Sequence, residues 1–211
     1  MSAPIEFWFD FSSPYAYFAA MEIERRLDRF GRPLAWRPFL LGVAFQRTGM
    51  VPMVDIPMRG DYTHRDCTRI ARMLGVPFHF PPDHPFGSQV AARAFYWFEI
   101  HMPQAATRFA RAVFSRYYGD GRDVRTIEGV LEIASEFDCD LGALAEWLPG
   151  SEAKALLRAR CSEALAKGVF GSPFLIMDDE PFWGWDRIPM AAHWLEHGTW
   201  DDRSRTDKEA I

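Results

Sequence analysis

The chain has 211 residues, of which 48% are hydrophobic and 25% charged, so it can bury a core without disulfides or metals. Its formal net charge of −5 provides no positive field for phosphate backbones, so nucleic acid is not an expected partner. The chain lacks a basic signal segment, a membrane-length apolar run and a Cys-x-x-Cys pair, which predicts a cytoplasmic protein, not membrane-bound, with three free cysteines.

The first forty residues predict a strand, a helix and a second strand. Residues 4–11 alternate and are rich in aromatic side chains, as is typical of a strand. Ser13 and Pro14 then suit the cap and first position of a helix that ends before Gly31. Residues 34–40 again have a strand pattern, which completes a βαβ unit of a parallel sheet.

After Leu41, glycines and prolines indicate a loop-rich passage, and helical patterns then continue to about residue 167. The predicted helices cover residues 62–74, 89–101, 105–118, 124–137, 141–148 and 152–167. We interpret this stretch as a helical insertion, in which the aromatic run 95–98 belongs first to the core and second to a pocket wall. The cysteines at 67, 139 and 161 fall in helical patterns and are interpreted as buried apolar fillers.

The last part of the chain predicts a hairpin and a helix. Residues 172–177 and 180–183 are the predicted strands, Asp178 and Asp179 the turn, residues 188–196 the helix, and the charged tail from Thr199 is expected to fray. The whole layout predicts an α/β protein with a thioredoxin-like fold and an inserted all-helical domain. The expected boundaries are 1–45 and 168–211 for the discontinuous thioredoxin-like domain and 46–167 for the helical insertion domain.

Ser13 is the first candidate for chemistry. The N-terminus of a helix presents unpaired N–H groups and a partial positive charge, which stabilise an anion such as a thiolate. The Ser13 hydroxyl could donate a hydrogen bond to that anion. The alternative is that Ser13 is an ordinary helix cap followed by Pro14, and both interpretations stay open on the residues alone.

A second candidate is the Gly171-Ser172-Pro173 sequence before a predicted strand. We predict that the Ser172-Pro173 peptide bond is cis, which would leave the backbone N–H and C=O of Ser172 free to pair with an extended peptide. The alternative is a simple turn that enters an edge strand.

These two segments, with two more, resemble one family over nearly the whole chain. The residues that carry the resemblance are Phe9-Asp10-Phe11-Ser12-Ser13-Pro14-Tyr15, Gly75-Val76-Pro77-Phe78 with Phe80-Pro81, Gly168-Val169-Phe170-Gly171-Ser172-Pro173 and Phe182-Trp183-Gly184-Trp185-Asp186-Arg187. The chain is similar to kappa-class glutathione transferases and bacterial 2-hydroxychromene-2-carboxylate isomerases, relatives of the disulfide-bond oxidoreductases.

The resemblance implies glutathione as the cofactor. Ser13 is expected to interact with its sulfur, Ser172 to pair with its cysteinyl backbone, and Asp186 to bind its γ-glutamyl end. We assign Tyr15, Pro173 and Trp185 to the same site. Because no cysteine stands at the helix start, the chain cannot cycle a disulfide there, and the thiol must come from the ligand.

Two positions depart from the family pattern and concern the substrate. Met50 stands where relatives commonly have Asn, and Trp185 where they have a small polar residue, so each removes a polar contact. We assign Arg47, Met50 and Arg59 to the substrate side of the site, the two arginines as partners for a carboxylate. Solvated surface charge is the alternative for both arginines.

The predicted function is a glutathione-dependent isomerase of the 2-hydroxychromene-2-carboxylate isomerase type. The expected substrate is a small unsaturated aromatic keto acid or similar electrophile, and the resemblance implies a homodimer. The alternatives are a kappa-type glutathione transferase or peroxidase, and a thiol- or peptide-binding module that has lost catalysis. No metal site is predicted, because the six histidines lack ligand spacing.

Overall fold

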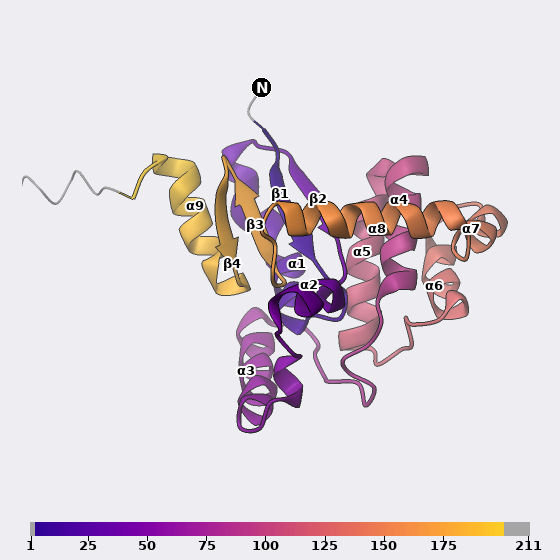
Figure 1. Cartoon of the computed structure of the whole chain (residues 1–211), viewed down its shortest axis with the longest axis horizontal. Coiled ribbons are helices and arrows are strands. Elements are labelled where there is room, and N and C mark those ends of the chain that lie inside the picture. Colours follow the sequence, from indigo (N-terminus) through magenta and orange to yellow (C-terminus); the bar gives the residue numbers. More distant parts are fainter. Residues whose placement is uncertain (1–2, 201–211) are drawn as a thin grey trace, which may run out of the picture.

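The computed structural model describes residues 3–200, and a four-stranded sheet lies at its centre (Figure 1). Strand β1 (Ile5–Phe9) runs parallel to β2 (Leu34–Pro38), with Ile5 opposite Leu34. Strand β3 (Phe174–Met177) is antiparallel to β1 and pairs with β4 (Glu180–Trp183), so the order is β2-β1-β3-β4. The predicted βαβ and ββα units therefore join into one sheet through the β1–β3 pair.

Helix α1 (Pro14–Leu27) connects β1 to β2 and begins as the sequence predicts. Ser13 is its cap and Pro14 its first residue. A 3-10 turn follows the helix and ends at Gly31, where φ is +62°. Helix α9 (Ile188–His197) packs against α1. The start of α1 is thereby held at the carboxyl end of the buried strand β1.

Aromatic side chains on β1 fill the core on one face of the sheet. Phe7 and Phe9 stack with ring centroids 5.0 Å apart, and Trp36 of β2 meets both rings edge-on. Phe9 also contacts Phe114 at 5.6 Å between centroids. All four rings are buried, and such contacts add to the free energy gained by removing their surface from water.

Seven helices lie between β2 and β3. They are α2 (Leu41–Thr48), α3 (Arg59–Leu74), α4 (Gln89–His101), α5 (Pro103–Phe114), α6 (Ile127–Ala134), α7 (Leu141–Trp147) and α8 (Ser151–Ala166). Residues 46–167 are all described and contain no strand, which confirms that this stretch is mainly helical. Figure 1 shows α3 on one side of the molecule and α4 to α7 on another, and the division into two domains stays a prediction.

Two local predictions were wrong. The expected loop after Leu41 begins with helix α2, whose first N–H group is bonded by the carboxylate of Asp10, 2.7 Å away, rather than by a cap residue of its own. Cys139 lies in the turn between α6 and α7, half-buried, where its thiol donates to the carbonyl of Ala134. Cys67 and Cys161 are buried in helices as predicted.

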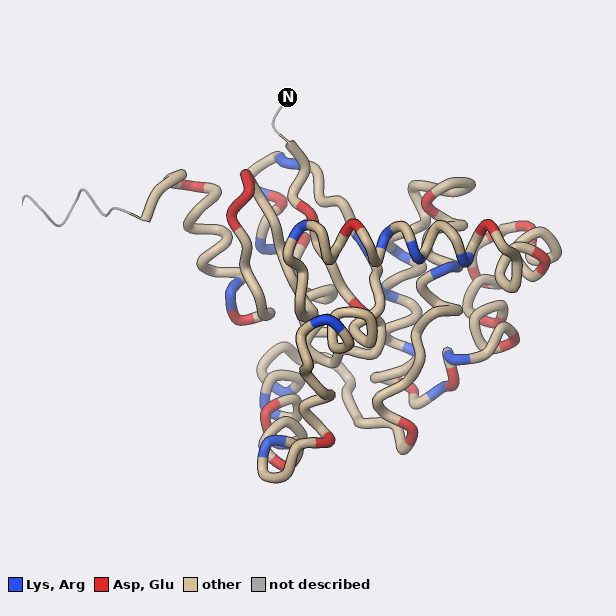
Figure 2. The backbone as a smooth tube through the Cα atoms, viewed as in Figure 1, with Lys and Arg blue, Asp and Glu red and all other residues tan. Residues whose placement is uncertain are grey.

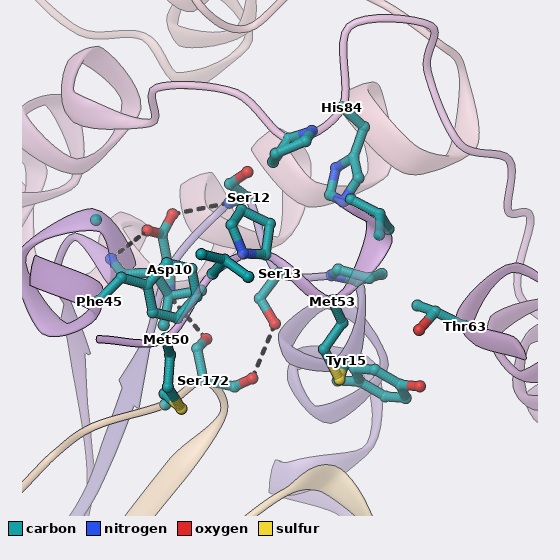
Figure 3. Close-up of a pocket in the computed structure, with 18 of the residues that line it drawn as sticks. Asp10, Ser12, Ser13, Tyr15, Phe45, Met50, Met53, Thr63, His84 and Ser172 are labelled. Carbon is teal, nitrogen blue, oxygen red and sulfur yellow. Dashed lines mark hydrogen bonds between the residues drawn. The ribbon is translucent and has the colours of Figure 1, made fainter. Parts of the chain in front are cut away.

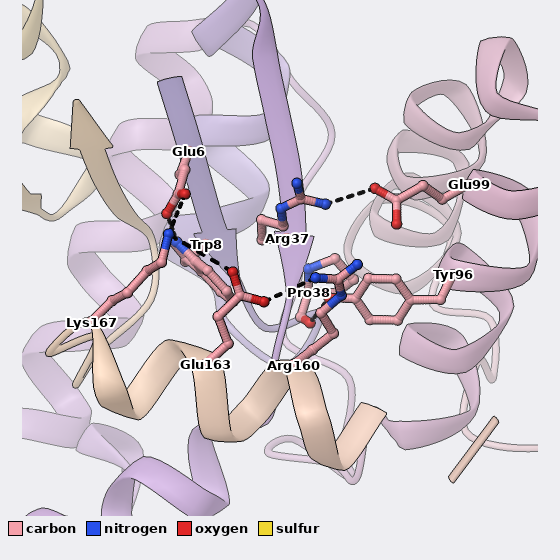
Figure 4. A network of polar contacts seen from close by, with 9 residues as sticks. All are labelled: Glu6, Trp8, Arg37, Pro38, Tyr96, Glu99, Arg160, Glu163 and Lys167. Carbon is pink, nitrogen blue, oxygen red and sulfur yellow. Dashed lines mark hydrogen bonds and ion pairs between the residues drawn. The ribbon is translucent and has the colours of Figure 1, made fainter. Parts of the chain in front are cut away.

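Helix α8 lies on the face of the sheet opposite to Phe7 and Phe9, beside a polar network (Figure 4). Lys167 pairs with Glu6 of β1, and Arg160 pairs with Glu163 at 2.9 Å. Beside them the hydroxyl of Tyr96, in α4, donates to the carbonyl of Pro38 at 2.6 Å. The whole aromatic run 95–98 is buried, which confirms its place in the core.

Tyr96→Phe tests the stability that this network contributes. The hydroxyl is fully buried, so its removal leaves the Pro38 carbonyl without that donor and should lower the free energy of unfolding by about 1–3 kcal/mol in a urea titration. Tyr62→Phe is the matched control, because Tyr62 is exposed on α3, and it should change stability by less than about 0.5 kcal/mol. Equal effects of the two variants would contradict the assignment.

Acidic and basic residues are mixed along the outer helices, as α3 and α8 show in Figure 2. No helix within residues 3–200 is both long and apolar enough to cross a membrane.

Candidate functional site

A cavity of about 530 Å³ opens where α1 begins, beside α2 and the segment before β3 (Figure 3). Its polar lining comes from Asp10, Ser12, Ser13, Tyr15, Arg59, Thr63, His84 and Ser172. Its apolar wall comes mainly from Leu41, Phe45, Met50, Val51, Pro52, Met53, Val54, Ile56, Pro85, Phe86 and Trp183. A polar floor thus faces a largely apolar wall, as in most small-molecule sites.

Ser13 lies on the polar floor, only 4% exposed. Its hydroxyl oxygen accepts a hydrogen bond from the N–H of Ala16 at 3.2 Å, the normal bond of a helix cap. The same hydroxyl donates to the carbonyl of Ser172 at 2.9 Å. Ser13 is therefore both a helix cap and the link between the two segments that the sequence singles out.

The Ser172-Pro173 peptide bond is cis, which confirms the prediction. The Ser172 hydroxyl accepts from the N–H of Asp10 at 2.9 Å, so the side chain of Ser172 is bonded just after β1 and its backbone carbonyl at the start of α1. Gly171 allows Trp183 to pack closely, because a Cβ atom at Gly171 would lie 2.3 Å from the Trp183 Nε1 atom. A larger residue at Gly171 would displace this part of the cavity wall.

Asp10 organises three segments around the cavity. Its carboxylate accepts from the N–H of Ser12 at 2.8 Å, from the N–H of Leu41 at 2.7 Å and from the hydroxyl of Ser88. Burial raises the pKa of the Asp10 carboxyl, and these three donors oppose that rise. Asp10 thus positions the starts of α1, α2 and α4 rather than acting as an exposed acid or base.

His84 lies across the cavity floor from Ser172, with Ser13 between them in Figure 3. Burial and the neighbouring His64 lower the pKa of His84 to about 4, so its imidazole is neutral at physiological pH. The loop that carries it is bonded to the start of α1, because the N–H of Phe86 donates to the Ser12 hydroxyl at 2.9 Å.

Near the cavity lie a phenol, that of Tyr15, and a thiol, that of Cys67, and both stay protonated at neutral pH. The Tyr15 hydroxyl donates to the carboxylate of Asp66 at 3.0 Å, and burial raises the pKa of Tyr15. Burial likewise raises the pKa of the Cys67 thiol to about 12. Neither side chain can supply an anion at neutral pH.

The structure brings five of the nine predicted site residues together in the cavity lining: Ser13, Tyr15, Met50, Arg59 and Ser172. The other four lie outside that lining: Arg47 is exposed on α2, Pro173 is buried, Trp185 is half-buried, and exposed Asp186 pairs with Arg187 at 3.3 Å. The segment that leads to Asp186 nevertheless lies beside Ser172 in space, because the N–H of Gly184 donates to the carbonyl of Pro173 at 3.0 Å.

Several lining residues were not predicted from the sequence, notably Asp10, Ser12, His84 and the apolar residues Met53, Val54 and Ile56. Asp10 and Ser12 stand in the same motif as Ser13, so a buried carboxylate at a strand end was a usable signal. For His84 the only signal was its place in a proline-rich loop. Within residues 3–200 no group of three or more His, Cys, Asp or Glu residues could hold a metal ion.

Several known proteins resemble this chain in sequence and fold. Glutathione S-transferase kappa 2 of Caenorhabditis elegans is 27% identical over 204 residues, which cover 90% of this chain and 91% of that protein. The 2-hydroxychromene-2-carboxylate isomerase of Sphingobium xenophagum is 27% identical over 203 residues, covering 92% and 99%. A solved structure of 2-hydroxychromene-2-carboxylate isomerase superposes with a TM-score of 0.83 at 23% identity, over 96% of this chain and 98% of that one.

The fold is therefore the predicted thioredoxin-like α/β fold. The DSBA-like thioredoxin domain family matches residues 4–196, nearly the whole described chain. The chain belongs to the DSBA-like thioredoxin domain family, among relatives named kappa-class glutathione transferases and 2-hydroxychromene-2-carboxylate isomerases.

Proposed function

We propose that the protein is a glutathione-dependent isomerase of the 2-hydroxychromene-2-carboxylate isomerase type. The observation that carries this proposal is the hydrogen bond from the Ser13 hydroxyl to the carbonyl of Ser172 on the polar floor of the cavity. It joins a hydroxyl at a helix N-terminus, suited to a thiolate, to a backbone group suited to an extended peptide.

Glutathione fits these two groups through an exchange of hydrogen bonds. Its cysteinyl N–H would donate to the Ser172 carbonyl, the acceptor that Ser13 occupies in this structure. The Ser13 hydroxyl would then turn its hydrogen to the sulfur, while its oxygen still caps α1 through the N–H of Ala16. The thiolate would also gain the partial positive charge of the helix end.

The chain itself offers no suitable thiol at this place. Ser13-Pro14-Tyr15-Ala16 occupies the helix start, and the Cys67 thiol is buried with its pKa raised to about 12. A thiol that reacts here must therefore arrive with the ligand. The names of the kappa-class relatives support glutathione as that ligand.

In the proposed reaction the glutathione sulfur adds to an activated carbon of a small electrophile. The former double bond becomes single and rotates, and expulsion of the thiolate restores the double bond. The apolar wall, which includes Met50, suits an aromatic body, and Arg59 at the start of α3 is the lining residue that can pair with a substrate carboxylate. Arg47 is exposed and lies outside the lining, so we give it no role in holding the substrate.

The two parts of this proposal, glutathione binding and isomerisation, can be tested separately. Calorimetric titration with glutathione should show saturable binding, and ultraviolet difference absorbance should show thiolate in the complex at neutral pH. Isomerisation of an unsaturated aromatic keto acid should then depend on glutathione without consuming it. Consumption of glutathione with a stable conjugate would instead favour the transferase alternative, which the kappa-class relatives support, and binding without any turnover would favour the binding module.

Asp186→Asn tests the expected contact with the γ-glutamyl end. A charge-assisted hydrogen bond to the ligand ammonium contributes about 1.5–3 kcal/mol, so the variant should bind glutathione about tenfold more weakly or worse in the same titration. Asp179→Asn is the matched control, since Asp179 is also exposed but lies in the β3–β4 turn at φ +64°, which Asn tolerates. Unchanged affinity in a folded Asp186→Asn protein would remove Asp186 from the site.

The proposal also places the protein in the cytoplasm as a homodimer. The absence of Cys-x-x-Cys and the three free cysteines suit a reducing compartment. Analytical ultracentrifugation of the purified chain tests the dimer.

A further inference from the structure

His84 is a polar residue of the cavity that the proposed handling of glutathione does not use. Its ring is fixed by aromatic neighbours, with centroids 5.1 Å from Phe80 and 5.9 Å from Tyr118. Phe80 in turn contacts His64, with the ring centroids 4.1 Å apart and the rings tilted by 53°. These contacts hold the imidazole in one orientation at the edge of the apolar wall.

The surroundings of His84 decide which ring nitrogen carries the proton. Its Nδ1 atom is buried and has no hydrogen-bond partner, whereas Nε2 is not among the buried unpartnered atoms. A buried N–H without an acceptor is rarer in proteins than an unpaired acceptor, so the neutral ring is expected to keep its proton on Nε2. His84 then presents one N–H donor and no charge, because its pKa is lowered to about 4.

Three uncharged hydroxyl donors of the lining are already engaged, and Arg59 is assigned to a substrate carboxylate. The Tyr15 hydroxyl donates to Asp66, and the Thr63 hydroxyl donates to the carbonyl of Arg59 at 2.8 Å. The Ser13 hydroxyl is assigned to Ser172 or to the glutathione sulfur. His84 is therefore a donor left for the part of the ligand that lies beyond the sulfur.

We propose that His84 donates a hydrogen bond from Nε2 to the carbonyl oxygen of an α,β-unsaturated carbonyl substrate. The inference rests on the proposed function and adds His84 to the residues that would bind its substrate. When the thiolate adds to the β-carbon, the electron pair of the double bond moves to the carbonyl oxygen and forms an enolate. A neutral N–H stabilises that developing charge without a proton transfer, and the pair returns when the thiolate leaves.

The experiment uses benzylideneacetone, an uncharged aromatic enone, isotopically labelled at its carbonyl carbon. Infrared difference spectra of the ketone bound to the protein with S-methylglutathione, which cannot add, should show the carbonyl stretch lowered in the wild type. His84→Leu should lose that lowering, and His84→Gln, which keeps an N–H donor, should restore most of it. His79→Leu is the control, because His79 lies in the same loop region, exposed and outside the cavity lining.

Activity gives a second readout. The glutathione-dependent conversion of the Z isomer of this ketone to the E isomer should have a kcat/KM about tenfold lower in His84→Leu, mainly through kcat. Glutathione affinity and the pKa of the bound thiol should not change. A carbonyl stretch and a kcat/KM that are the same in wild type and His84→Leu would overturn the proposal, as would failure of the ketone to bind the wild type. Failure of glutathione to bind would overturn the proposed function instead. The carbonyl stretch of the ketone, recorded without S-methylglutathione, would then still test the hydrogen bond from His84.

Discussion

Ser13→Ala is expected to raise the pKa of the thiol of bound glutathione by about one to two units. A hydrogen bond to a charged group contributes about 1.5–3 kcal/mol, whereas the helix end contributes only about 0.3–1 kcal/mol, so the hydroxyl is the larger of the two effects. The thiolate fraction, and with it turnover, should fall by about tenfold to a hundredfold at a pH below the pKa of the bound thiol in the wild type, and by less at a pH above it.

The existing bond from Ser13 to Ser172 sets an upper limit on this effect. To reach the sulfur, the hydroxyl must give up the Ser172 carbonyl 2.9 Å away. If the cysteinyl N–H of glutathione takes over that carbonyl, no acceptor is left unpaired and the full effect is available. If the carbonyl is left without a donor, the exchange costs about 1–3 kcal/mol and the pKa of the bound thiol would hardly change in the variant.

The measurement is a titration of thiolate absorbance in the glutathione complex of each protein. Loss of the helix cap alone should lower stability by about 0.5–2 kcal/mol, so a control must lose a cap elsewhere. Thr126→Ala does this, because Thr126 caps α6 through the N–H of Gly129 at 3.1 Å and lies outside the cavity lining. A thiol pKa that is the same in both variants and the wild type would leave Ser13 as a helix cap only.

The outline of the fold could be predicted because its signals are local. The strand β1, the cap and proline of α1 and the Asp178-Asp179 turn each depend on neighbouring residues, and the turn adopts the positive φ angles, +52° and +64°, that a two-residue hairpin needs. Helix α2 could not be predicted in this way. Its first N–H bonds to Asp10, thirty-one positions earlier, so nothing beside it in the sequence marks its start.

The same distinction separates the site residues. Ser13 and Ser172 were found because each stands in a short motif, and their mutual contact follows from the β1–β3 pairing that joins the two ends of the chain. The part of the apolar wall formed by Met53, Val54 and Ile56 has no such motif. It is positioned by close packing, since a Cβ atom at Gly60 of α3 would lie 2.4 Å from the carbonyl oxygen of Val54.

Asp10→Asn is expected to lower the free energy of unfolding by about 2–4 kcal/mol and to weaken glutathione binding with it. The amide has one acceptor oxygen where the carboxylate has two, so its NH2 group must face the N–H of Ser12 or of Leu41. One helix start is then left unpaired inside the protein, beside Ser13. Asp123→Asn is the control: Asp123 also accepts from a backbone N–H, that of Arg125 at 2.8 Å, but at the surface, and should cost less than about 1 kcal/mol.

The difference in unfolding free energy between wild type and Asp10→Asn should depend on pH, and this dependence tests whether the pKa of the buried carboxyl is raised. Burial raises the pKa of Asp10 above its ordinary 3.8, so the native protein holds the proton to a higher pH than the unfolded chain does. The slope of unfolding free energy against pH is then negative: the stability that Asp10 contributes is complete below pH 3.8 and declines as pH rises through the native pKa. The asparagine side chain of the variant does not titrate. The difference in unfolding free energy between wild type and Asp10→Asn, measured in urea titrations, should therefore narrow from about pH 4 upward. A difference that widens with pH would show that the donors from Ser12, Leu41 and Ser88 outweigh burial and lower the pKa of Asp10 below its value in the unfolded chain.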